Sequence, residues 1–126
     1  MIVLDTHAAV WWSADPKRLS ARAGRAIASA DRVGIPAIVF WEVSLLVRRR
    51  RLALEISVHD WAEKVCAIPR VEPMPLTVEL ALLADSLPMH PDPADRFIVA
   101  AALQRGARLV TRDKLIRPLA IVETVW

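Results

Sequence analysis

The amino-acid sequence predicts an α/β fold in which helices cover both faces of a mostly parallel sheet. The first observation is a set of short apolar runs, each with the length of a buried strand. These runs lie at residues 2–4, 33–35, 71–76, 109–111 and 121–125. The second observation is that segments with helical patterning alternate with the runs, as in folds that join parallel strands through helices.

The helices are predicted from the signals at their ends. In chain order, these signals are the Asp15-Pro16 turn, the N-cap residue Ser20, Pro36 at the start of a helix, the capping residues Ser57 and Thr77, and the closing residue Gly106. They place helices at residues 6–13, 20–30, 37–50, 57–67, 78–87 and 94–105.

Two of these helices are expected to bury particular side chains. Ile38, Trp41 and Leu45 share one face of their helix, and this face is predicted to pack against the core. Trp61 is predicted to be a core residue in the same way. Cys66 is the only cysteine, so no internal disulfide can form, and the sequence around it predicts a buried structural thiol.

The composition indicates one globular domain over residues 1–126. The chain is 55% hydrophobic and 25% charged, which excludes a disordered protein. No apolar run approaches the roughly 20 residues of a membrane span, and residues 1–5 lack the features of a signal peptide, so a cytoplasmic location is expected. The net charge of +3 weakly favours anionic partners, and the three histidines are too scattered for a zinc site.

Five of the 14 acidic residues stand apart from solvated helix faces: Asp5, Glu42, Asp92, Asp95 and Asp113. Asp5 and Asp113 follow predicted strands, and ligands of open α/β sheets bind outside the carboxyl ends of strands. Asp95 begins a helix that can face the same crevice. Converging carboxylates repel each other, and Mg²⁺ or Mn²⁺ is the simplest compensation. Such a site serves phosphodiester hydrolysis without a protein nucleophile.

Four of these acids, each taken alone, also have a structural explanation. Asp5, Asp92 and Asp95 stand where acids cap helices or complement their dipoles, and Asp113 stands where turn residues are common. Glu42 is different, because it lies in the most apolar helix and needs a partner if it is buried. The joint pattern therefore favours function more than any single residue does.

Basic residues flank the same segments. Arg96, Arg112 and Lys114 lie beside Asp95 or Asp113 and are candidates for contacts with phosphates. The run at residues 48–51 is equally compatible with phosphate binding and with a solvated helix end. The five tryptophans could stack on nucleobases, but their apolar neighbours favour the core.

Four motifs occur together in this order: Leu4-Asp5-Thr6-His7, Phe40-Trp41-Glu42-Val43, the segment 92–100 that begins Asp-Pro-Ala-Asp-Arg, and Val110-Thr111-Arg112-Asp113. Together they resemble the PIN-domain family, in particular bacterial VapC-type toxins, over nearly the whole chain. The resemblance implies a three-layer α/β/α sandwich with a sheet of about five strands. Two positions depart from the family pattern, since Ala94 stands where an aromatic residue is common and no glycine occurs near Arg50.

The resemblance also implies a function. Asp5, Glu42, Asp95 and Asp113 would form an acidic catalytic centre for one or two Mg²⁺ or Mn²⁺ ions, with Asp5 and Asp95 as direct ligands. Supporting roles would fall to Thr6, Asp92 and Thr111. The implied activity is endoribonuclease cleavage of RNA by a metal-activated water, leaving a 5′-phosphate and a 3′-hydroxyl. The implied partners are a cognate antitoxin and a second copy of the chain.

Three other functions remain open at this point. An aspartyl-phosphate phosphatase would use Asp5 as its nucleophile, but such enzymes usually carry an acid where this chain has His7. A non-catalytic or degenerate RNA-binding module would rely on basic residues such as those at 48–51, although no helix-turn-helix, RNA-recognition or zinc-finger signature is present. A receiver-like signalling domain is the weakest candidate, because it needs an acidic pair near the first strand.

Overall fold

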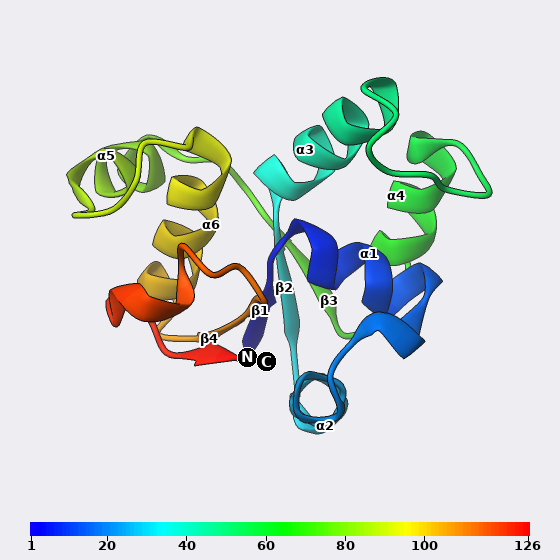
Figure 1. Cartoon of the computed structure of the whole chain (residues 1–126), viewed down its shortest axis with the longest axis horizontal. Coiled ribbons are helices and arrows are strands. Elements are labelled where there is room, and N and C mark those ends of the chain that lie inside the picture. Colours follow the sequence, from blue (N-terminus) through cyan, green and yellow to red (C-terminus); the bar gives the residue numbers. More distant parts are fainter.

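The computed structural model describes residues 1–126, which form a sheet of five strands with helices packed around it (Figure 1). The strands are β1 (Ile2–Leu4), β2 (Val33–Pro36), β3 (Val71–Met74), β4 (Arg108–Val110) and β5 (Thr124–Val125). They lie in the order β3-β2-β1-β4-β5, and every neighbouring pair is parallel. The predicted parallel sheet is confirmed, although the last strand is only two residues long.

Helices cover both faces of this sheet, as predicted. They are α1 (Thr6–Ala14), α2 (Ala21–Ser29), α3 (Ala37–Arg48), α4 (Val58–Cys66), α5 (Val78–Ser86) and α6 (Pro93–Gln104), with short 3-10 helices at Pro16–Arg18 and Arg117–Leu119. In Figure 1, α5 and α6 lie on one side of β1, β2 and β3, and α1 and α4 lie on the other. The arrangement is a three-layer α/β/α sandwich. No helix is long and apolar enough to cross a bilayer.

The predicted capping residues act as expected. Ser20, Ser57 and Thr77 each accept a hydrogen bond from the backbone N–H three residues later, at 3.0, 3.1 and 3.1 Å. Each bond satisfies one of the free donors at a helix start, which explains why α2, α4 and α5 begin where they do. Gly106 follows α6 with a φ of +57°, a backbone conformation that favours glycine.

The buried face of α3 differs from the prediction. Val39 and Val43 are fully buried, whereas Trp41 is 54% exposed, and Ile38 and Leu45 are only partly buried. The apolar pattern of this helix is almost continuous, so several faces fit a core position equally well. In the structure, Val39 and Val43 belong to the core, α3 packs against α1, α4 and α6, and the Trp41 indole is left in solvent.

The two predictions for α4 have opposite outcomes. Trp61 is buried as expected, and its indole N–H donates a hydrogen bond to Ser13 Oγ at 2.9 Å. Cys66 is exposed, so the prediction of a buried thiol is wrong. Val65 occupies the buried position next to it, which turns the Cys66 side chain away from the core.

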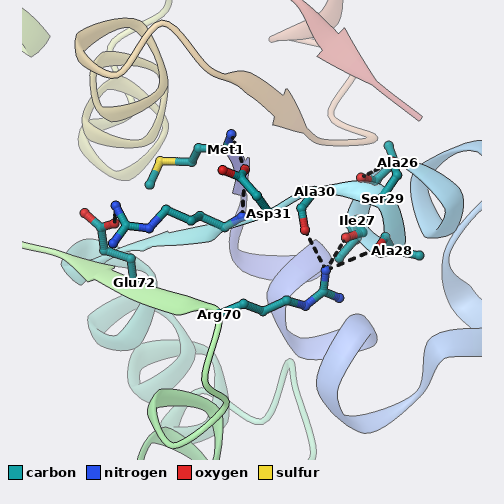
Figure 2. Close-up of polar contacts among 10 residues, drawn as sticks. Met1, Ala26, Ile27, Ala28, Ser29, Ala30, Asp31, Arg70 and Glu72 are labelled. Atoms are coloured by element: carbon teal, nitrogen blue, oxygen red, sulfur yellow. Dashed lines mark hydrogen bonds and ion pairs between the residues drawn. The ribbon is translucent and has the colours of Figure 1, made fainter.

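Polar contacts tie together the amino ends of β1, β2 and β3 (Figure 2). They join the Met1 amino group to Asp31 at 3.0 Å, Glu72 to Arg32 and Arg105 at 3.0 and 2.6 Å, and the Arg70 guanidinium to the carbonyls of Ile27 and Ala30 at 2.8 and 3.0 Å. At this edge of the sheet, the charges of Met1, Asp31, Arg32, Glu72 and Arg105 are therefore paired with one another, and Arg70 is bonded to carbonyls. The opposite, carboxyl edge carries several acidic side chains.

Candidate active site

A cavity of about 740 Å³ opens at the carboxyl edge of the sheet. All five acids singled out in the sequence line it: Asp5, Glu42, Asp92, Asp95 and Asp113. Thr6, Arg112 and Lys114 line it too, as predicted, and so do His7, Leu46, Ile98, Arg117 and Trp126, which the sequence analysis did not place there. The acids come together because they follow β1 and β4, or lie on α3 and at the start of α6, next to that edge.

Asp5 is both a helix cap and a cavity residue. Its Oδ1 accepts a hydrogen bond from the Ala8 N–H at 2.7 Å, so the structural explanation for this residue is also correct. The side chain is only 8% exposed, and burial raises the pKa of Asp5 to about 7. The Thr111 hydroxyl and the Ala8 N–H oppose this rise by favouring the charged carboxylate. Thr111 itself lies behind Asp5 and does not line the cavity.

Glu42 has no cationic partner. Burial raises its pKa, and the nearby carboxylates of Asp95 and Asp92 raise it further. The Thr6 hydroxyl lies close enough to lower this pKa, yet its oxygen is buried and makes no hydrogen bond of ordinary geometry. The half-buried Glu42 carboxylate therefore has oxygens without a cationic partner, and the neighbouring Thr6 hydroxyl has no hydrogen-bond partner.

Asp92 and Asp95 stand at the start of α6. Asp92 caps the helix by accepting a hydrogen bond from the Asp95 N–H at 3.2 Å, and Pro93 occupies the first helical position. The Asp95 side chain lies 2.7 Å from His90 Nε2, and both side chains are 20% exposed. Burial raises the pKa of Asp95, and the hydrogen bond with His90 opposes that rise. His90 was missed because the sequence gives no signal that the loop before α6 folds back on it.

Replacing His90 by Ala should raise the pKa of Asp95, because the imidazole is the main group that favours its charged form. His90→Gln should retain a lower pKa, since the amide nitrogen can donate from nearly the same place as Nε2. Carbon-13 NMR titration of the Asp95 carboxyl group measures both. An Asp95 titration that is the same in His90→Ala and in the unaltered chain would show that this contact is not formed in solution.

Asp113 closes a turn after β4. Its Oδ1 accepts a hydrogen bond from the Leu115 N–H at 2.6 Å, and its own N–H donates to Thr111 Oγ1 at 3.0 Å. The predicted turn role is therefore observed together with a place in the cavity. The turn orients Arg112 and Lys114 on either side of Asp113, so that the cavity receives basic as well as acidic side chains from one short segment.

Arg96 does not have the exposed place that phosphate binding requires. Its guanidinium donates hydrogen bonds to four backbone carbonyls, those of Ala84, Asp85, Met89 and His90, at 2.7, 3.1, 2.9 and 3.1 Å. It does not line the cavity, and these contacts use its donors to hold the loop before α6. The expected phosphate contact is therefore corrected to a structural role. The arginines at 48–51 are exposed and also lie outside the cavity.

The donor set suits a hard divalent cation. Carboxylate oxygens are the ligands that Mg²⁺ and Mn²⁺ prefer. Burial is the main cause of the raised pKa values of Glu42 and Asp95, and a cation would relieve the repulsion between carboxylates that adds to it. No three of the His, Cys, Asp and Glu side chains are placed to ligate one ion together. An ion would therefore take one or two carboxylates and fill its other positions with water, as Mg²⁺ commonly does.

Comparisons with known proteins agree with this fold. The model of the PIN domain family matches residues 2–121. Ribonuclease VapC22 of Mycobacterium tuberculosis is 40% identical over 118 residues, which cover 92% of this chain and 89% of that protein. A toxin–antitoxin complex from Klebsiella pneumoniae contains a similar fold, with a TM-score of 0.68 at 18% identity and coverage of 100% and 97%. VapC20 of Mycobacterium tuberculosis has a TM-score of 0.68 at 21% identity, with 98% of each chain covered. This chain therefore belongs to the PIN-domain family and is a VapC-type member of it.

Proposed function

We propose that the protein is a metal-dependent endoribonuclease that acts as the toxin of a toxin–antitoxin pair. The observation that carries this proposal is a single cavity lined by five carboxylates together with three basic side chains. The relative with 40% identity is named a ribonuclease, and VapC20 is described as a toxin that cleaves the sarcin-ricin loop. We expect the protein to act in the cytoplasm, because its proposed substrate is found there.

In this proposal Asp5 and Asp95 bind the ion directly, and Glu42 and Asp113 act through water or on a second ion. When bound, Mg²⁺ or Mn²⁺ supplies an activated water and positive charge at the scissile phosphate. Thr111 orients Asp5, and His90 holds one oxygen of Asp95 so that the other is free for the cavity. Asp92 and Thr6 support these acids from the start of α6 and of α1.

The basic residues of the cavity bind the RNA backbone in this proposal. Arg112, Lys114 and Arg117 line the cavity and can neutralise phosphates on either side of the scissile bond. Because acids and basic side chains line the same cavity, one RNA strand can contact both. A protein nucleophile is not required, and Asp5 is poorly placed to be one, since it is 8% exposed and one of its oxygens is occupied by the Ala8 N–H.

The antitoxin is proposed as the main protein partner, as in the Klebsiella complex. The surface supports an assembly, because large apolar side chains are exposed to solvent. They are Trp41, Ile56, Leu76, Val78, Leu82 and Leu115. We expect the antitoxin, a second copy of the chain, or both to cover part of this surface.

The proposal is tested by incubating purified protein with structured RNA and Mg²⁺ or Mn²⁺, and in parallel with EDTA. Cleavage is expected with either metal and should be absent with EDTA. A folded double variant, Asp5→Asn with Asp95→Asn, should be inactive under all conditions. Cleavage by this variant, or by the unaltered chain in EDTA, would exclude the metal mechanism. No cleavage of several RNAs by folded, antitoxin-free protein would favour a degenerate RNA-binding module.

A further inference from the structure

The side chains that line the cavity include two groups of different chemistry. One group is the five carboxylates described above, and the other comprises His7, Arg112, Lys114, Arg117 and Trp126. Three of these five residues are basic and two are aromatic. The basic residues account for phosphate binding, but nothing so far explains why two aromatic rings line a cavity in which acidic and basic side chains predominate.

The two rings are held in place by a third ring beneath them. His7 lies in the first turn of α1, and Trp11 lies one turn later on the same face of the helix, with 5.3 Å between their ring centres. Trp126 directly follows β5 and so reaches the carboxyl edge, where its ring centre lies 5.7 Å from that of Trp11. Trp11 is only 3% exposed. A buried indole therefore supports both rings that border the cavity.

The same indole also holds Arg112. The Arg112 guanidinium carbon lies 4.6 Å from the centre of the Trp11 ring, well within the range of a cation–π contact. A second arginine, Arg18, contacts Trp11 from 5.2 Å. Arg112 is exposed, yet this contact restricts where its charge can lie. A fixed positive charge thus stands beside the aromatic rings at the cavity wall.

We propose that His7, Arg112 and Trp126 form a stacking site for one unpaired nucleobase of the RNA, next to the phosphate that the proposed reaction cleaves. This rests on the proposed ribonuclease function and adds where a base binds. A nucleotide matches these residues because its base has a flat face for the rings and its phosphates are anions for Arg112 and its basic neighbours. The cavity volume of about 740 Å³ lies within the roughly 300–1,000 Å³ of typical ligand pockets.

The test measures binding of a short, fluorescein-labelled, single-stranded RNA by anisotropy in Mg²⁺, with every protein in an Asp95→Asn background to prevent cleavage. A matched set of oligonucleotides carries an abasic ribose at one position at a time around the mapped cut site. Trp126→Ala should weaken binding of the intact RNA on the order of 10- to 100-fold. In the protein that retains Trp126, one abasic position should weaken binding by the same factor as Trp126→Ala does. In Trp126→Ala, that abasic position should cause no further loss of affinity.

Two variants serve as controls. Trp126→Phe keeps a stacking ring and should retain most of the affinity. Trp41→Ala removes an exposed tryptophan outside the cavity and should bind as the unaltered chain does. If Trp126→Ala does not fold, His7→Ala, which changes an exposed side chain, is compared on the same oligonucleotides.

The inference is overturned if the aromatic variants bind the intact RNA normally, or lose the same affinity for intact and abasic RNA. The rings would then serve packing or a protein partner. Cleavage by the unaltered chain is measured in parallel, so that the two proposals can fail separately. A chain that cleaves RNA without coupling to any base position contradicts only the stacking site, whereas one that neither binds nor cleaves RNA contradicts both.

Discussion

Replacing Asp5 by Asn is expected to stabilise the metal-free protein at pH 8 while abolishing its proposed activity. The pKa of Asp5 is raised from 3.8 to about 7 in the folded chain, mainly by burial. Between these values the folded state binds a proton that the unfolded state has lost, so stability falls as the pH rises through this window. Above pH 7, ionised Asp5 lowers the free energy of unfolding by the full amount, up to about 4 kcal/mol.

Asparagine avoids this cost because it does not ionise, and its side-chain oxygen can still cap the Ala8 N–H. Urea unfolding in EDTA at pH 5 and pH 8 should show a loss of stability with pH for the unaltered chain and a smaller one for Asp5→Asn. Mg²⁺ should stabilise the unaltered chain at pH 8 and not the variant. RNA cleavage should fall by about 100-fold or more. Replacing a residue that only hydrogen-bonds to a metal ligand already lowers metal affinity or activity by about 10- to 100-fold.

Asp85→Asn is the matched control, because it removes an exposed aspartate outside the cavity. It should leave the difference in stability between pH 5 and pH 8 unchanged. If Asp5→Asn has the same pH dependence as the unaltered chain, burial does not hold the Asp5 carboxyl protonated. If it also cleaves RNA normally, Asp5 is not a ligand.

Replacing Arg96 by Met is expected to have the largest effect on folding. The guanidinium donates to two carbonyls in the last turn of α5 and to two in the segment that joins α5 to α6, and a hydrogen bond to a charged group is worth about 1.5–3 kcal/mol. These bonds share one side chain and do not add fully, so a loss of about 3–5 kcal/mol in the free energy of unfolding is expected. Methionine keeps the apolar stem and removes only the hydrogen bonds.

Arg96→Lys should be nearly as damaging, because an ammonium group cannot reach four carbonyls in a fork geometry. Arg25→Met changes an exposed arginine on α2 and should alter stability by less than about 0.5 kcal/mol. Chemical denaturation measures all three variants. A loss below about 1 kcal/mol for Arg96→Met would mean that water replaces these contacts at little cost.

The sequence predicted the elements that depend on local signals. Ser20, Ser57 and Thr77 satisfy donors within their own helices, so their positions can be recognised without knowing the rest of the fold. The strand-end acids were also predictable, because any parallel sheet collects the residues after its strands at one edge. Glu42 added a buried charge that called for a partner.

The remaining features depend on contacts between distant segments. Arg96 and His90 have structural partners only because the segment between α5 and α6 folds back onto the start of α6. No periodic pattern in the sequence predicts the path of that segment. Trp126 lines the cavity only because β5 pairs with β4. Trp41 was misplaced because an apolar helix does not reveal which of its faces meets the sheet.

The strand order also determines when the site can exist during protein synthesis. β1 is synthesised before its two neighbours in the sheet, β2 and β4, and β4 follows all the helices α1 to α6. The cavity acids extend from Asp5 to Asp113. A nascent chain therefore carries Asp5 and Glu42 while about 70 further residues are added, without Asp113 or the strand that positions it. The cavity can assemble only after β4 and Asp113 have been synthesised, so a translation product that stops before them contains the first acids without the complete site.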